Sequence, residues 1–182
     1  MNGDRDEKID YFMYRLRRKL EKLVKYRREF TWKFFQGFVE GANEVDFDDS
    51  NWKKVEFPLT VNLWKGDVWL RCRVVVPSEI SGVAIRGSIV KLSSPSPIIG
   101  HAEIYVDSKL VRSARFWTEM RGPRIVVSKD ARPGEEHVIA IHIHRSERPA
   151  EIPPMEITYS NVEDAIFEIE AFIAEIDFAS FI

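Results

Sequence analysis

Apolar residues recur every three or four positions near the start of the chain. Between about Lys8 and Phe30, charged residues separate them and neither Gly nor Pro occurs. The apolar positions are Ile9, Phe12, Leu16, Leu20, Leu23 and Val24. This spacing places their side chains on one face of a helix. The pattern therefore predicts a basic amphipathic helix in an N-terminal segment of residues 1–39.

The period changes to two between residues 40 and 147. Short runs rich in Val and Ile alternate there with Pro and Gly, and the clearest expected strands are residues 68–76, 83–92, 102–106 and 138–143. Asp107-Ser108-Lys109 is expected to turn one strand back on the next, although Ser is a poorer choice than Gly where a tight turn needs positive φ. Such strands and turns are typical of an antiparallel β-sandwich.

The last part of the chain divides into a predicted linker and a predicted helix. Residues 148–160 are expected to be extended and unpaired, because Pro149, Pro153 and Pro154 cannot donate to a sheet. The helix, residues 161–182, has its start signal at Ser160 and Glu163, which can form a capping box. The chain is thus mainly β, with one α-helix at each end.

Two apolar stripes run along the predicted C-terminal helix. Val162, Ile166, Ile169, Ile173 and Ile176 form one stripe, and Phe167, Ala171, Ala174, Phe178 and Phe181 form the other. A helix that is apolar over so wide an arc is normally buried on more than one side. Because Phe178, Phe181 and Ile182 crowd the last turn, we expect a partner, or a further segment of chain, to cover them. A homo-oligomer is a possible alternative.

Charge is distributed unevenly between the two ends. The whole chain has a formal charge of −2, whereas residues 11–28 carry +7 and the residues after Arg148 carry −8. Opposite charges would orient the two helices if they docked on each other, but each charge run could equally be a solvated helix face. The near-neutral total and the lack of a stacking platform argue against nucleic acid as a partner.

Targeting signals and cysteine chemistry add little. The N-terminus lacks the apolar core of a secretion signal, and no run of about 18 apolar residues occurs, so we expect no membrane partner. The single cysteine, Cys72, lies in an apolar strand and is expected to be a buried, inert thiol. A cytoplasmic location is the expectation.

The order of several motifs resembles the N-terminal region of prokaryotic glycoside hydrolase family 38 α-mannosidases. The matching motifs are Asp48-Asp49-Ser50-Asn51-Trp52, Val68-Trp69-Leu70-Arg71, Val74-Val75-Val76-Pro77, Glu103-Ile104-Tyr105-Val106-Asp107, Pro133-Gly134-Glu135 and the 162–178 helix. The resemblance implies a jelly-roll β-sandwich followed by a helical connector into a catalytic domain. Strands of the W-x-R type that close on V-P also occur in the sugar-binding domains of family 2 β-glycosidases.

The family's chemistry lies outside this sequence. Its catalytic domain opens with an H-x-D motif that binds zinc, and none of the histidines at 101, 137, 142 and 144 is followed two positions later by Asp. The resemblance therefore implies no catalytic residue and no cofactor in this chain, and a zinc ion would belong to the missing catalytic domain. The leading hypothesis is an ancillary module that docks on such a domain through Phe178, Phe181 and Ile182.

A metal site within the chain is the weaker interpretation. His142 and His144 are two apart on a strand and share a face, as in His-x-His metal sites. The sequence offers no third ligand, so capping of a sheet edge is favoured and no metal is expected. Asp46, Asp48 and Ser50 resemble the start of a calcium loop, but Phe57 stands where a bidentate Glu is needed. A turn capped by Asp48 or Asp49 is the better interpretation.

Four residues are candidates for carbohydrate binding. Trp69 and Arg71 lie on the less apolar face of the 68–76 strand, and Trp64 and Trp117 lie in a loop or at a strand end. Trp can stack on a sugar ring and Arg can donate to hydroxyls, although packing is the more common role of each. A free-standing carbohydrate-binding module is therefore the alternative function, and a metal-dependent enzyme is a third.

Overall fold

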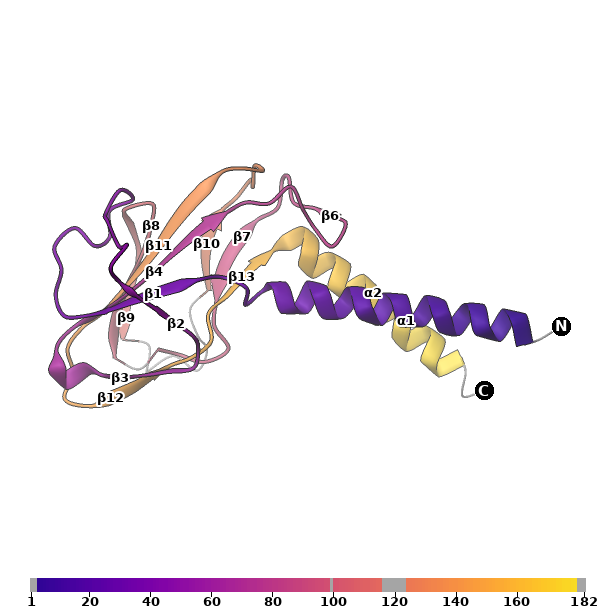
Figure 1. Cartoon of the computed structure of the whole chain (residues 1–182), viewed down its shortest axis with the longest axis horizontal. Helices are drawn as coiled ribbons and strands as arrows, with labels where there is room; N and C mark the ends of the chain where they lie inside the picture. The colour runs from indigo at the N-terminus through magenta and orange to yellow at the C-terminus, as the bar shows by residue number, and fades with distance from the viewer. Residues whose placement is uncertain (1–2, 99, 116–123, 180–182) are drawn as a thin grey trace.

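The computed structural model describes residues 3–98, 100–115 and 124–179, with side chains from residue 7 onward. Helix α1 (Gly3–Tyr26) and helix α2 (Ser160–Ala179) lie side by side and project from one end of a β-sandwich (Figure 1). The strands are β1 (Trp32–Gln36), β2 (Lys53–Val55), β3 (Leu59–Asn62), β4 (Val68–Val75), β5 (Glu79–Ile80), β6 (Val83–Ala84), β7 (Val90–Ser93), β8 (His101–Val106), β9 (Lys109–Arg115), β10 (Arg124–Ser128), β11 (Glu136–Ile143), β12 (Pro149–Ile152) and β13 (Glu156–Tyr159). A short 3-10 helix, η1 (Leu63–Lys65), follows β3.

One layer of the sandwich is a six-stranded antiparallel sheet in the order β2-β1-β4-β11-β8-β9. A three-stranded sheet, β10-β7-β13, and two two-stranded sheets, β12-β3 and the β5-β6 hairpin, complete the described strands. The predicted fold class is confirmed: an antiparallel β-sandwich with one helix at each end. No helix among the described residues is both long and apolar enough to cross a membrane.

The two-residue period of β4 builds the core. Val68, Leu70, Cys72 and Val74 point inward and are fully or almost fully buried, together with the inward residues of β7, β8, β11 and β13. Burial also raises the pKa of the Cys72 thiol to about 12, as expected of an inert cysteine.

The outer face of the same sheet is covered by the segment between β1 and β2. Ala42 and Trp52 from this segment form a second apolar cluster with Trp69 of β4 and Ala140 of β11. Strand β11 is consequently buried on both faces from His137 to Ile143. A strand with this environment reads as continuously apolar, interrupted here only by its histidines.

The β8–β9 hairpin forms at the predicted turn. Asp107 and Ser108 both adopt positive φ, at 50° and 67°. Both carry side chains that bind neighbouring backbone: Ser108 Oγ accepts from Val45 N at 3.0 Å and Asp107 Oδ1 accepts from Val138 N at 2.8 Å. These bonds offset the strain that a non-glycine residue meets in the left-handed region.

The structure corrects several predicted boundaries. The first helix ends at Tyr26 and not at Phe30, and residues 32–36 form strand β1 inside the segment assigned to that helix. The expected 83–92 strand is split into β6 and β7, and Gly87 between them has φ of 82°. The division of the chain into domains stays a prediction.

Residues 148–160 are not an unpaired linker, because they contain β12 and β13. Among the described strands, β12 pairs with β3 alone and β13 with β7 alone. Edge strands tolerate Pro because one row of their N–H groups faces away from the sheet, so Pro149 can begin β12.

The two terminal helices dock on each other. The rings of Phe12 and Phe172 meet edge to face with centroids 6.1 Å apart, and Arg27 and Arg17 of the N-terminal segment bind Glu163 and Asp177 of α2. Of the two interpretations of the charge runs, the structure supports docking. We call the projecting pair of helices the helical arm.

Candidate functional site

The helical arm carries an apolar stripe that the described chain does not cover. The first stripe of α2 faces inward, with Val162 and Ile166 buried. The second stripe faces solvent, since Phe167 is 73% exposed and Phe178 is 70% exposed, and Ala171 between them is exposed too. Phe181 and Ile182, expected to extend this surface, lie outside the described residues. Large apolar groups arranged in a row usually mark a binding surface.

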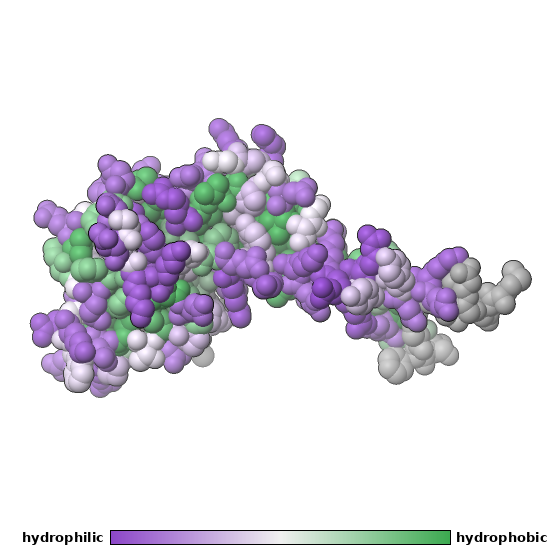
Figure 2. All heavy atoms as spheres, in the orientation of Figure 1, coloured by the Kyte–Doolittle hydropathy of each residue, from purple (hydrophilic) through white to green (hydrophobic). Residues whose placement is uncertain are grey.

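Further exposed rings come from α1. Tyr11 is 64% exposed, Phe12 49% and Tyr14 59%, and Phe12, Leu16, Ile169 and Phe172 line a shallow apolar hollow between the helices. The face of the arm seen in Figure 2 is mostly hydrophilic. The arm therefore combines a solvated face with a set of exposed aromatic side chains.

Two ion pairs link the N-terminal segment to α2, one near each end of that helix. Arg27 binds Glu163 with two contacts, Nε to Oε1 at 2.9 Å and Nη2 to Oε2 at 2.6 Å. Near the other end, Arg17 Nη2 donates to both carboxylate oxygens of Asp177 at 3.0 and 2.9 Å. The Glu163 carboxylate of the expected capping box therefore binds Arg27. The Ser160 hydroxyl of the same motif accepts a hydrogen bond from Ile89 N at 3.0 Å. The side chains of the expected capping box make contacts that join α2 to the rest of the chain.

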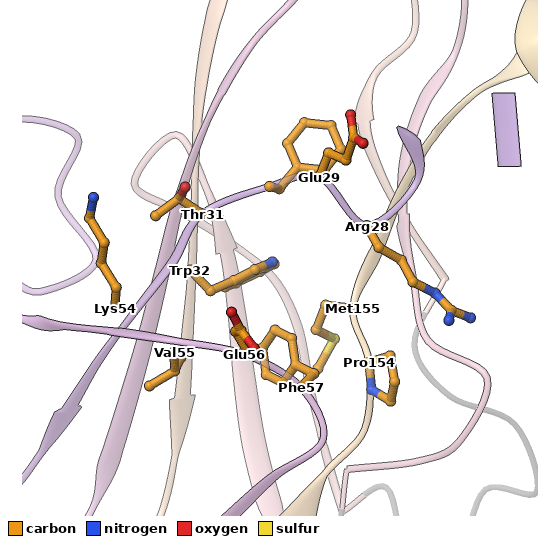
Figure 3. A pocket seen from close by; sticks show the side chains of 11 residues that line it. Arg28, Glu29, Thr31, Trp32, Lys54, Val55, Glu56, Phe57, Pro154 and Met155 are labelled. Atoms are coloured by element: carbon orange, nitrogen blue, oxygen red, sulfur yellow. The ribbon is translucent and has the colours of Figure 1, made fainter. Parts of the chain in front are cut away.

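A pocket lies where the chain leaves α1 and enters β1. It has a volume of about 480 Å³, and its aromatic members include Phe30, Trp32 and Phe57. Figure 3 shows Trp32 in the middle of the lining side chains, with Phe57 and Met155 beside it and Lys54 and Arg28 on opposite sides. Trp32 is 2% exposed and its Nε1 makes no hydrogen bond to a described residue. The lining thus combines aromatic and aliphatic side chains with the charged groups of Arg28, Glu29, Lys54 and Glu56.

The structure separates the sugar-binding candidates. Trp64, in η1, is 58% exposed. Trp69 is 3% exposed, with its ring stacked on that of His142 at 4.2 Å and an interplanar angle of 2°. Arg71 is 1% exposed. Trp69 and Arg71 therefore offer no surface to a sugar in this conformation, and Trp117 lies outside the described residues.

Arg71 has a structural role that its sequence position only hinted at. Its Nε donates to Asp49 Oδ2 at 2.9 Å, and its Nη1 donates to the carbonyl of Ala42. Lys33 Nζ binds Asp49 Oδ1 at 2.6 Å. Burial raises the pKa of Asp49, but the hydrogen bonds from Lys33 and Arg71 outweigh it and hold that pKa below its ordinary value. Arg71 thus ties the covering segment to the sheet.

Asp48 caps the turn as expected, because Ser50 N donates to its Oδ1 at 2.9 Å. The calcium-loop pattern around Asp46 is accordingly a turn within the segment between β1 and β2. Its carboxylates at 48 and 49 are occupied by protein donors. We draw no metal chemistry from this loop.

His142 and His144 belong to a larger polar cluster at the end of the six-stranded sheet. His142 Nε2 lies 2.8 Å from Asp67 Oδ2, and its Nδ1 lies 3.5 Å from Glu103 Oε2. His144 Nε2 lies 3.4 Å from the same Glu103 oxygen, and the ring of His101 stacks on that of His144 at 4.4 Å. We call these five residues the histidine cluster.

Sequence reasoning found two members of the histidine cluster and missed three. Antiparallel pairing of β11 with β8 sets His142 opposite Glu103, and a hydrogen bond from His144 N to His101 O, 2.9 Å long, continues the pairing by one step. The available signal was the His101-x-Glu103 spacing, which puts both side chains on one face of β8. Nothing in the sequence alone gave the register.

The two carboxylates of the histidine cluster, Asp67 and Glu103, both have lowered pKa values. Burial raises the pKa of Asp67, but bonds from Arg145 N and His142 outweigh it and leave the pKa lowered. For Glu103, burial is likewise outweighed, first by the hydroxyl of Tyr105, which donates to Oε2 at 2.9 Å, and then by the nearby imidazoles of His144 and His142, so its pKa is lowered too.

The fold, and not the sequence, connects this chain to known proteins. No protein-family model matches the sequence, and no curated protein matches it either. Among solved structures, a β-glucuronidase from glycoside hydrolase family 2 is 18% identical over 66% of this chain and 14% of its own, with a TM-score of 0.53. A family 2 member from Bacteroides cellulosilyticus is 17% identical over 70% of this chain and 20% of its own, with a TM-score of 0.51.

A third similar structure is β-glucuronidase 2 of Bacteroides uniformis, 16% identical over 68% of this chain and 17% of its own, with a TM-score of 0.51. At this identity the likeness establishes the fold alone. The chain spans between one seventh and one fifth of the length of these proteins. The first two of these structures are members of glycoside hydrolase family 2, the third is a β-glucuronidase, and none of the three is an α-mannosidase.

Proposed function

We propose that this chain is an ancillary module of a glycoside hydrolase, which docks on a catalytic domain and positions it. The observation that carries the proposal is the exposed second stripe of α2, with Phe167 and Phe178 more than two thirds exposed. Burying these rings would gain about 25 cal/mol for each Å² removed from water. The likeness to parts of glycoside hydrolases supports the same class of partner.

The finer proposal is that the catalytic domain is of the α-mannosidase type. It rests on the resemblance of the motifs around Trp52, Trp69 and Asp107 to the N-terminal region of that family. The zinc ion of such an enzyme would be bound by the partner domain. A cytoplasmic location belongs to this proposal as well.

Site-specific photocrosslinking in the source cells tests the docking. A photoreactive phenylalanine analogue replaces Phe167 or Phe178, and in a control variant it replaces Lys65, which is exposed in η1 beside the end of β1 that lies away from α1. We expect the two arm positions, but not Lys65, to crosslink to a glycoside hydrolase domain with an H-x-D motif. Crosslinks only between copies of this chain would replace the proposal with a homo-oligomer, and crosslinks to a hydrolase of another class would remove the mannosidase part.

Carbohydrate binding is the second candidate, favoured by the exposed ring of Trp64. The pocket around Trp32 is a separate place where a sugar could bind, because aromatic and charged side chains line it together. Calorimetric titration with mannose and with glucuronic acid distinguishes the two places. Loss of binding in Trp64→Ala would assign the sugar to the exposed ring, and loss in Lys54→Ala would assign it to the pocket. If neither sugar gives heat of binding, the chain does not bind these two sugars.

A further inference from the structure

The histidine cluster has the composition of a metal site. It brings together three imidazoles and two carboxylates: His101, His142, His144, Asp67 and Glu103. The two carboxylates have lowered pKa values and are ionised near neutral pH. The two carboxylates give the cluster negative charge, which a divalent cation would balance.

The distances suit a small transition-metal ion. Ligand atoms of His101, Glu103 and His144 all lie within 4.8 Å of one another, and His144 Nε2 is 3.4 Å from Glu103 Oε2. A tetrahedral zinc ion with bonds of about 2.0–2.1 Å holds its ligand atoms roughly 3.3 Å apart. Small side-chain movements would therefore be enough for His101, Glu103 and His144 to coordinate one ion.

One nitrogen in the cluster lacks the partner that burial normally demands. His144 Nε2 is inaccessible to solvent and makes no hydrogen bond to a described residue. A buried imidazole nitrogen in this state costs free energy unless it gains a partner, and a metal ion would supply one. The rings of His101 and His142 lie 4.4 Å and 4.2 Å from that of His144, so three imidazoles converge on this position.

The neighbouring residues hold the three groups in place. Ser113 Oγ lies 3.0 Å from His101 Nε2, and the Tyr105 hydroxyl donates to Glu103 Oε2. His142 is fixed between Asp67 and the ring of Trp69. Metal ligands are commonly oriented by such outer contacts. Tyr105 and Ser113 lie in β8 and β9, and strands position side chains more firmly than loops do.

We infer that His101, Glu103 and His144 bind a divalent transition-metal ion of the zinc class, with Asp67 and His142 as positioning residues. All three ligands are partly exposed, so an ion can enter from solvent. Imidazole and carboxylate together suit zinc better than magnesium or calcium. Three protein ligands leave a fourth position, which water fills in sites of this kind. The inference is independent of whether the helical arm docks on a hydrolase.

Calorimetric titration of tag-free, chelator-treated protein with Zn²⁺ tests the site. We expect one ion per chain, an affinity reduced at least about 100-fold in His144→Ala, and a reduction of about 10-fold or more in Glu103→Gln. Glu136→Gln, an exposed carboxylate on β11, is the matched control and leaves the affinity unchanged. Absence of zinc binding at 100-fold molar excess, or equal affinity in all variants, overturns the inference.

A second measurement needs no variant. Long-range ¹H–¹⁵N spectra of the imidazoles follow each histidine ring as Zn²⁺ is added. We expect the ring nitrogens of His101 and His144 to shift, while His137, which is bound to Asp107 at the opposite end of β11, does not. Shifts of equal size in His137, or none in His144, would mean an adventitious interaction only.

Discussion

The sandwich core and the outer part of the helical arm are stabilised by different interactions. Ile141, in the middle of the six-stranded sheet, is fully buried. On α2, Ile166 of the inner stripe is 4% exposed and belongs to the core, whereas Phe167 and Phe178 of the outer stripe are 73% and 70% exposed. The sandwich folds by burying its own apolar residues, whereas the arm retains apolar surface that it does not use in this chain. The arm is therefore the region whose sequence is explained by a partner.

The largest expected effect lies in the sandwich core. Ile141→Ala removes buried methyl groups and leaves a cavity, so we expect the free energy of unfolding to fall by about 2–5 kcal/mol. Val111→Ala, on the outer strand β9 where Val111 is 44% exposed, is the control and should change it by less than about 0.5 kcal/mol. Urea unfolding followed by tryptophan fluorescence measures both, and similar losses would contradict the contrast between buried and exposed positions.

Arg71 tests whether the covering segment is part of the sandwich. Arg71→Ala leaves the Asp49 carboxylate without its buried partner, and we expect a loss of about 2–3 kcal/mol. This is below the cost for a fully buried pair, because Asp49 keeps Lys33 and some water. Arg73→Ala, two residues along β4, breaks an exposed pair with Glu136 and should cost at most about 1 kcal/mol. Equal losses would show that burial of Arg71 is not what matters.

The same contact predicts a pH dependence. Because the pKa of Asp49 is lowered in the folded state, folding is favoured by its ionised form at pH values above the unfolded pKa, and this contribution is lost as the pH falls through the folded pKa. As the pH falls below about 4, the urea midpoint should therefore fall more steeply in the wild type than in Asp49→Asn. Parallel curves for the two proteins would exclude Asp49 as a contributor.

The sequence predicted local features well and distant pairings poorly. The alternation in Val68–Val75, the Asp107-Ser108 turn and the start of α2 at Ser160 each depend on neighbouring residues, and the structure has them. Strand β1 was assigned to a helix segment because its position is fixed by pairing with β4, which no local pattern encodes.

The histidine cluster shows the same limit at the level of the site. His142 and His144 stood out because they are two positions apart in the sequence. Glu103 and His101 come close to them only through the register of β8 against β11. Likewise, Trp69 looked available because the sequence does not show that the segment after β1 folds over it. The exposed stripe of α2, in contrast, was readable from its helical spacing alone.

Within the arm, the inner ion pair should contribute more than the outer one. Arg27 binds Glu163 through two contacts and is 24% exposed, so we expect Arg27→Ala to lower stability by about 1 kcal/mol. Thermal unfolding followed by the helical circular dichroism signal, which comes mainly from α1 and α2, measures this change. The five tryptophans at 32, 52, 64, 69 and 117 all lie outside α1 and α2, so their fluorescence reports the sandwich. An unchanged helix signal on thermal unfolding would contradict the role of Arg27.

The outer pair gives the smallest expected effect. Arg17 and Asp177 are about half exposed, and exposed pairs contribute little because water screens their charges and fixing two long side chains costs entropy. Arg17→Ala should therefore lower the midpoint of the helix signal by less than Arg27→Ala, with a cost of at most about 0.5 kcal/mol, and should not move the tryptophan signal. A double-mutant cycle with Asp177→Ala isolates the pair. A coupling as large as that of Arg27 with Glu163 would mean that the outer arm is held as firmly as its base, and that its exposed rings are fixed in place before any partner binds.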